Sequence, residues 1–206
     1  NDLVNGLFAV PEGGDGAAPG VASLVSAGVQ LIAWWYFVVF LLFFVKDSVL
    51  RLKAYGTLGG HILGFAALNV YGKLALTEAF RGSPVMTLLD AVIALVTMGL
   101  LFMSSRLVRG CLQAADCVGG EDDARWHDQS LDTGNDFFAL CIGFLLSMCL
   151  RFGITGELPS IDGELGGASA AEVSALALAG AGLFLLGGAL ALALHRAQAA
   201  SGEEGV

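Results

Sequence analysis

The residues best placed to do chemistry are polar side chains that fall inside or at the ends of long apolar stretches. They are His61, Asn69, Lys73, Asp90 and Arg151. Such groups are costly in a bilayer, so they usually face a partner or a cavity. Lys73 and Asp90 fall at similar distances from the turn that joins their stretches, which predicts an ion pair. Two other interpretations stay open: Lys73 reaches the membrane surface alone, or the pair transfers ions.

His61 is the one histidine inside an apolar stretch, because His127 falls in a connection and His195 at the end of the last stretch. This spacing offers no pair of histidines to ligate haem across a bilayer. We expect a hydrogen bond from His61 to a neighbouring helix. A proton relay is the alternative, because a histidine titrates near neutral pH. Asn69 would share that path or bind a neighbouring helix.

The four cysteines do not indicate a metal site, and no metal or other cofactor is predicted. Cys141 and Cys149 fall in an apolar stretch, where cysteine behaves as a small apolar residue. Cys111 and Cys117 fall in a connection with His127, and three ligands do not complete a structural zinc site. Spacing leaves open whether Cys111 and Cys117 form a disulfide.

Composition points to a membrane protein without a nucleic-acid partner. Only 14% of the residues are charged, whereas a soluble domain carries about 25%. The net charge is −9, and acidic residues cluster at 116–136 and 157–172, which we expect to be solvated loops. A vestibule that attracts cations is the alternative. The motifs of serine hydrolases, zinc proteases and P-loop proteins are absent, so the chain is predicted not to be an enzyme.

Five apolar stretches must position these side chains. They run over about 21–45, 55–76, 84–103, 136–154 and 172–194. Each has roughly the 20 residues that cross about 30 Å of hydrocarbon. With the N-terminus outside, most cations lie inside, as membrane proteins prefer. The inner cations are Lys46, Arg51, Lys53, Arg106, Arg109, Arg125 and Arg196. We therefore predict an all-α integral membrane bundle of five transmembrane helices, with the C-terminus inside.

The segments around these stretches complete the predicted organisation. Residues 1–20 form a flexible outer tail, 21–196 the transmembrane domain and 197–206 an inner tail. The basic part of 104–135 extends the third stretch along the membrane surface, and 119–135 forms a mobile loop. The chain begins with Asn1, so we expect a cleaved leader and an organellar inner, thylakoid or bacterial inner membrane.

Small residues predict where helices pack closely. Gly56, Gly60 and Gly64 recur every four residues on one helical face, as in G-x-x-x-G contacts. Ala177, Ala181 and Gly188 form a similar face on the last stretch. The aromatic block that contains Trp34 and Trp35 is predicted to pack or to face lipid. A bound lipid, or a pigment or quinone at Trp34 and Trp35, is the alternative.

The first four stretches form a faint tandem repeat. Leu41–Phe44 and Leu100–Met103 end the first and third stretches, and each precedes a basic segment. The following stretches each contain Gly-Phe, at Gly64 and Gly143. With Asp132-Thr133-Gly134-Asn135 entering the fourth stretch, this pattern resembles the YjfL-like family of multi-spanning membrane proteins of unknown function. The resemblance covers about 30–155, supports the fold and implies no catalytic residues.

Small-residue faces without a catalytic constellation favour a non-catalytic role. The predicted function is an accessory or scaffolding subunit of a larger membrane assembly, such as an organellar energy-transducing complex. Its partners would be membrane lipids and other membrane subunits or further copies of the chain. The alternative is a small channel or an ion or proton transporter that uses His61, Lys73 and Asp90.

The topology can be tested by labelling single cysteines in a chain whose own cysteines are replaced. Cysteines at Gly16 and Gly163 should react with an impermeant reagent from one side of the membrane. Cysteines at Gly120 and Ser201 should react from the other side. Labelling of Gly16 and Gly120 from the same side would contradict the five-span topology.

Overall fold

A computed structural model describes residues 20–115, 121–158 and 169–203, and all regular structure in these ranges is α-helical. This confirms the all-α prediction. The helices are α2 (Val21–Phe44), α3 (Val49–Ala75), α4 (Pro84–Ala115), α5 (Glu121–Thr155) and α6 (Ala170–Glu203). The chain divides into two compact units, residues 1–149 and residues 150–206.

Four helices, α2, α4, α5 and α6, are long and apolar enough to cross a membrane. They give the chain the architecture of a multi-pass membrane protein. The helix α3 is less apolar because it carries several glycines together with His61 and Asn69. Much of α3 is buried in the bundle, because glycines on two of its faces lie against neighbouring helices.

The helix α5 begins much earlier than the sequence suggested, and the prediction of a mobile loop over 119–135 is wrong for residues 121–135. Three acidic residues, Glu121, Asp122 and Asp123, occupy its first turn. Their charges complement the positive end of the helix dipole. Trp126, Ser130 and Thr133 then recur at helical spacing and are buried, so this polar segment has an inward face that stabilises it as a helix.

The helix α6 belongs to the second unit and starts with a capping box. The backbone N–H of Ser169 donates to the Glu172 carboxylate at 2.7 Å, and the Glu172 N–H donates to the Ser169 hydroxyl at 3.3 Å. Two free N–H groups of the first turn are thereby satisfied. The helix continues to Glu203, beyond the predicted end at 194, because Ala197, Ala199 and Ala200 are strong helix formers.

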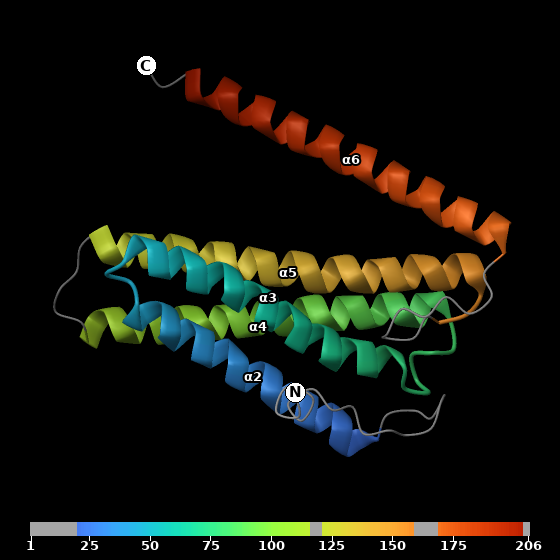
Figure 1. Ribbon diagram of the computed structural model, residues 1–206, viewed down its shortest axis with the longest axis horizontal. Coiled ribbons are helices and arrows are strands. Elements are labelled where there is room, and N and C mark those ends of the chain that lie inside the picture. Colours follow the sequence, from blue (N-terminus) through green and yellow to red (C-terminus); the bar gives the residue numbers. More distant parts are fainter. Residues whose placement is uncertain (1–19, 116–120, 159–168, 204–206) are drawn as a thin grey trace. The chain divides into compact units, whose positions relative to one another are not determined.

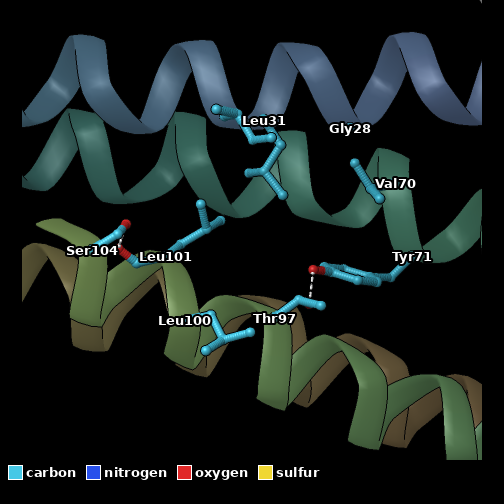
Figure 2. A pocket seen from close by; sticks show the side chains of 9 residues that line it. Gly28, Leu31, Val70, Tyr71, Thr97, Leu100, Leu101 and Ser104 are labelled. Atoms are coloured by element: carbon cyan, nitrogen blue, oxygen red, sulfur yellow. Dashed lines mark hydrogen bonds between the residues drawn. The ribbon is translucent and has the colours of Figure 1, made fainter.

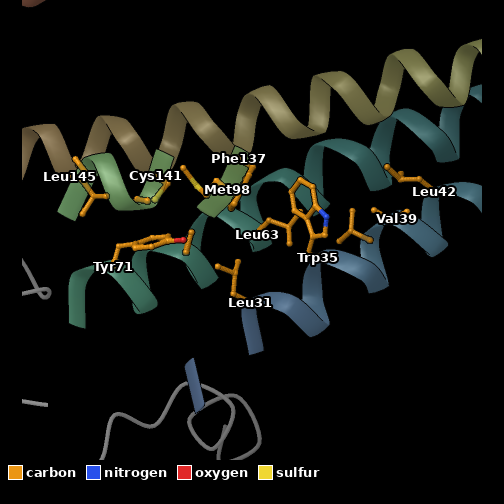
Figure 3. Packing of buried hydrophobic residues seen from close by; sticks show 14 of the residues in the cluster. Leu31, Trp35, Val39, Leu42, Leu63, Tyr71, Met98, Phe137, Cys141 and Leu145 are labelled. Atoms are coloured by element: carbon orange, nitrogen blue, oxygen red, sulfur yellow. The ribbon is translucent and has the colours of Figure 1, made fainter. Parts of the chain in front are cut away.

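The helices α2, α3, α4 and the described part of α5 in the first unit lie side by side around one apolar core (Figure 1). Trp35 of α2 packs on Phe137 of α5, with ring centroids 5.1 Å apart. Figure 3 shows side chains of all four helices meeting there. Further core members are Leu31, Val39, Leu42, Leu63, Tyr71, Met98, Cys141 and Leu145.

Glycines let α3 approach α5 closely. A Cβ atom added at Gly60 would lie 3.2 Å from the Thr133 carbonyl oxygen, and one at Gly64 would lie 2.9 Å from the Leu140 side chain. One at Gly56 would overlap Gln129. The predicted glycine face therefore lies on α5. We call this contact the glycine seam: Gly56, Gly60 and Gly64 against residues 129–140 of α5.

Replacing Gly60 with leucine should destabilise the bundle, because the neighbouring atom is backbone and cannot rotate away. Overpacking of this kind costs about 1–3 kcal/mol. Gly143→Leu is the matched control, since that glycine is exposed on α5 and a Cβ there meets nothing within 4 Å. Thermal unfolding in detergent should show a lower midpoint for Gly60→Leu alone. Equal midpoints for both variants would argue against the seam.

Candidate functional site

Polar side chains follow one face of α4. Asp90, Thr97 and Ser104 are seven residues apart, which is close to two helical turns, so they lie roughly in line along the helix. Each falls within the stretch of α4 that packs in the bundle. This face therefore gives the apolar core a row of groups that can accept or donate hydrogen bonds.

Asp90 is the most deeply placed member of this row. Its side chain is 0% exposed, and neither carboxylate oxygen has a hydrogen-bond partner among the described residues. Tyr71 of α3 and Cys141 of α5 lie close enough to interact with it electrostatically. Figure 3 shows these two residues reaching into the core from opposite helices. An ionised carboxylate without a partner is very costly in such surroundings.

The other two members of the row tie α4 to its neighbours. The Thr97 hydroxyl donates to the Ile93 carbonyl at 2.8 Å, so the Tyr71 hydroxyl must donate to Thr97. In the same way Ser104 donates to the Leu101 carbonyl at 2.7 Å and accepts from Tyr36, 2.9 Å away. Two tyrosines, one on α3 and one on α2, thus hold α4 by buried or half-buried hydroxyl pairs.

A groove of about 410 Å³ lies between the Tyr71–Thr97 pair and Ser104 (Figure 2). Tyr71 and Thr97 border one part of it, and Ser104 borders another. Aliphatic side chains of three helices form the rest, so the groove suits an apolar chain better than an ion. Its lining is Gly28, Leu31, Ile32, Val70, Tyr71, Thr97, Leu100, Leu101 and Ser104.

A half-buried ion pair joins the beginning of α5 to the end of α2. The Lys46 ammonium lies 2.5 Å from the Asp123 carboxylate, and the two side chains are 15% and 14% exposed. The same ammonium lies 4.7 Å from the centre of the Phe43 ring and 6.0 Å from that of Trp126. Cation–π contacts of this kind strengthen when desolvated. We call this group the inner clamp: Lys46, Phe43, Asp123 and Trp126.

A second cationic group gathers around Phe102 on α4. The Arg106 and Arg109 guanidinium groups lie 5.1 Å and 5.5 Å from the centre of that ring. Arg109 is buried, and its Nε and Nη2 atoms have no hydrogen-bond partner among the described residues. Gly134 of α5 also lies close to Phe102, since an added Cβ there would lie 3.0 Å from the ring.

The expected ion pair between Lys73 and Asp90 does not form in the described structure. Both side chains are buried, yet equal depth in adjacent helices does not make two residues face each other. Lys73 lies in the last turn of α3. There the negative end of the helix dipole favours a cation without help from Asp90.

His61 lies on the outer side of α3. Its side chain is exposed, and its Nδ1 atom lies 2.8 Å from the Thr57 carbonyl oxygen of the same helix. The hydrogen bond is thus within α3 and not between helices, as the sequence had suggested. Asn69 and Arg151 are half-buried. The small residues Ala177, Ala181 and Gly188 lie at exposed positions of α6.

The aromatic block does not present an open ring surface at Trp35. That side chain is 4% exposed and packs on Phe137, whereas Trp34 is half-buried with its ring edge on Phe37. A pigment or quinone contact at these residues stays a prediction. Cys111 is exposed, and Cys117 lies outside the described residues. Parts of the acidic segments 116–136 and 157–172 also lie outside them. No cluster of metal-binding side chains occurs in the described ranges.

Sequence reasoning missed the tyrosine pairs, the inner clamp and the burial of Arg109. The seven-residue spacing of Asp90, Thr97 and Ser104 was the one available signal for the row on α4. Asp132-Thr133-Gly134-Asn135, which carries the resemblance to the YjfL-like family, lies within α5 and not before it.

Comparisons with protein-family models, with curated proteins and with solved structures found no match to this chain. The resemblance to the YjfL-like family therefore stays a prediction.

The inner clamp should show energetic coupling between its two charges. A double-mutant cycle with Lys46→Met and Asp123→Asn should give an interaction free energy of about 0.5–3 kcal/mol, as residues in one charged network do. Arg125 and Asp122 provide the control, because they pair within one helix and are 40% and 47% exposed. That cycle should give at most about 0.5 kcal/mol. Equal coupling in both cycles would contradict a special role for the clamp.

Proposed function

We propose that this protein is a non-catalytic subunit of a larger membrane assembly, which it contacts through the outer face of α3. The observation that carries this proposal is the position of His61. It lies at the middle of α3, which has 27 residues, yet its side chain is exposed.

In this proposal α3 spans the membrane, as α2, α4, α5 and α6 also do, and the N-terminus of the chain lies outside. Its 27 residues rise about 40 Å, more than the roughly 30 Å of hydrocarbon. It lies among helices that are themselves apolar enough to span. The clustering of cations near the 44–53 end of the helices supports that end being inside.

A histidine at mid-membrane that faces only lipid is unfavourable. Ionisable residues in membrane helices almost always face the interior of the helix bundle, a cavity or a partner group. Next to His61 the surface of α3 carries a hollow of about 490 Å³, bordered also by Lys53, Thr57 and Leu58. A helix from another membrane protein would fill this hollow and offer His61 a hydrogen bond. Such bonds between membrane helices contribute about 0.6–2 kcal/mol.

The alternative, a channel or transporter that uses His61, Lys73 and Asp90 together, has less support. A shared path needs the three residues near one another or joined by polar groups. His61 is exposed on α3, whereas Asp90 is fully buried on α4, and no hydrogen bond or ion pair among the described residues links either of them to Lys73. The subunit role is therefore the better explanation of His61.

Photo-crosslinking in native membranes tests the interface. A photo-reactive residue at Leu58 should give an adduct with a protein of defined mass. The same residue at Val96 on α4 should give none, although both side chains are 56% exposed. An adduct with the mass of two chains would indicate a homo-oligomer in place of a mixed assembly. Lipid adducts alone at both positions would overturn the interface.

His61→Leu should separate the interface from the stability of the chain itself. Leucine suits lipid, so the thermal midpoint of the isolated chain should be unchanged or slightly higher. The amount of partner that co-purifies in mild detergent should fall several-fold, because about 1 kcal/mol corresponds to a factor of five. Full recovery of the partner with His61→Leu would speak against the proposal.

A further inference from the structure

We propose that Asp90 is a proton-binding site, where the carboxylate takes up one proton and is held in the bundle core as a neutral carboxylic acid. Asp90 lies in the core between α3, α4 and α5. Its role as a proton-binding site does not depend on the subunit role or on the interface at His61.

Within the described part of the chain, the carboxyl group of Asp90 is buried without a hydrogen-bond or ion-pair partner. Asp90 is 0% exposed, and both of its oxygens lack a hydrogen-bond partner among the described residues. An ionised carboxylate in apolar surroundings loses its hydration, which costs far more than a neutral polar group does. A bound proton removes the charge and turns one oxygen into a hydroxyl donor.

The described side chains near Asp90 include none that would pair with it as a cation. Tyr71 of α3 and Cys141 of α5 lie near its carboxyl group, and neither side chain can carry a positive charge. Lys73, the cation of α3 nearest in depth, forms no ion pair with it. On α4 itself the nearest cation is Arg106, sixteen residues away in the sequence, or about 24 Å along the helix. Among the described residues, no cation forms an ion pair that would neutralise the Asp90 carboxylate.

A metal cation fits this site less well than a proton does. Hard cations bind a cage of about six or more oxygen ligands. The Tyr71 hydroxyl is already engaged with Thr97, and the Thr87 hydroxyl lies 3.5 Å from the Ser83 carbonyl oxygen of its own helix. A proton needs only the Asp90 oxygens, so it is the occupant to which we commit.

The polar face of the first turns of α4 offers a route for exchange. Ser83, Thr87 and Asp90 follow one another at spacings of four and three residues, so they lie on one face. Asp90 is six residues after Pro84, or about 9 Å along the helix. Water at the turn before α4 would exchange the proton with Asp90 along these hydroxyls.

Infrared spectroscopy of the purified protein in bilayers at neutral pH tests the proposal. The wild type should show the C=O stretch of a protonated carboxylic acid, and Asp90→Asn should lose one such band. Asp132→Asn should keep it, because that carboxylate is exposed on α5. Identical spectra of the wild type and Asp90→Asn would overturn the proposal.

Thermal unfolding supplies a second readout. If the folded chain holds one proton more than the unfolded chain, its stability must fall as the pH rises. The difference in midpoint between the wild type and Asp90→Asn should therefore shift with pH in that direction. Asparagine resembles the neutral acid in shape, so the variant should be as stable as the wild type at low pH. A constant, large loss of stability in Asp90→Asn at every pH would contradict a bound proton.

A measurement on the wild type alone keeps the proposal testable if Asp90→Asn does not fold. Apolar carbodiimides react with protonated carboxyl groups, so they should modify Asp90 in intact membranes, as read by mass spectrometry of its peptide. The yield should decline as the pH rises. An unmodified Asp90 at every pH, with the bundle intact, would overturn the proposal.

Discussion

The close approach of α3 to α5 is the constraint on which the rest of the bundle depends. At Gly60 even a methyl group would be crowded, since a Cβ would lie 3.0 Å from the Asp136 Cβ and 3.2 Å from the Thr133 carbonyl oxygen. In a bilayer the hydrophobic effect does not drive helices together, so dense packing between small residues must do so. The seam brings α5 near enough for Phe137 to meet Trp35 and for Cys141 to approach Asp90. This contact therefore determines which side chains surround Asp90 in the core.

The helix α4 shows how the bundle accommodates polar groups. Thr97 and Ser104 satisfy their own donors on backbone carbonyls, which leaves each oxygen to accept from a tyrosine of another helix. Polar side chains in this arrangement specify which helices meet and at what depth. Asp90 lies in the same row without such a partner among the described residues. The difference separates groups that hold the bundle together from a group that is left available for a ligand.

The distribution of polar groups also differs between the inside and the outside of the first unit. The carboxyl group of Asp90 lies in the core of the bundle, and the imidazole of His61 lies on the exposed face of α3. The two positions have different physical demands. An acid in the core must lose its charge or pair with a cation, whereas His61 already bonds Thr57 through Nδ1 and needs a partner only for its other ring nitrogen.

Sequence alone determined the helical class, the approximate position of each apolar helix and the close packing at Gly56, Gly60 and Gly64, because length, hydropathy and residue size are local properties. It did not determine that the seam meets α5, that 121–135 is helical, or that Lys73 and Asp90 fail to pair. These features depend on how each helix is rotated about its axis, and a rotation of half a turn exchanges its buried and exposed faces. Only the packing of α2, α3, α4 and α5 decided that rotation, since side chains far apart in the sequence had to fit together at the same depth.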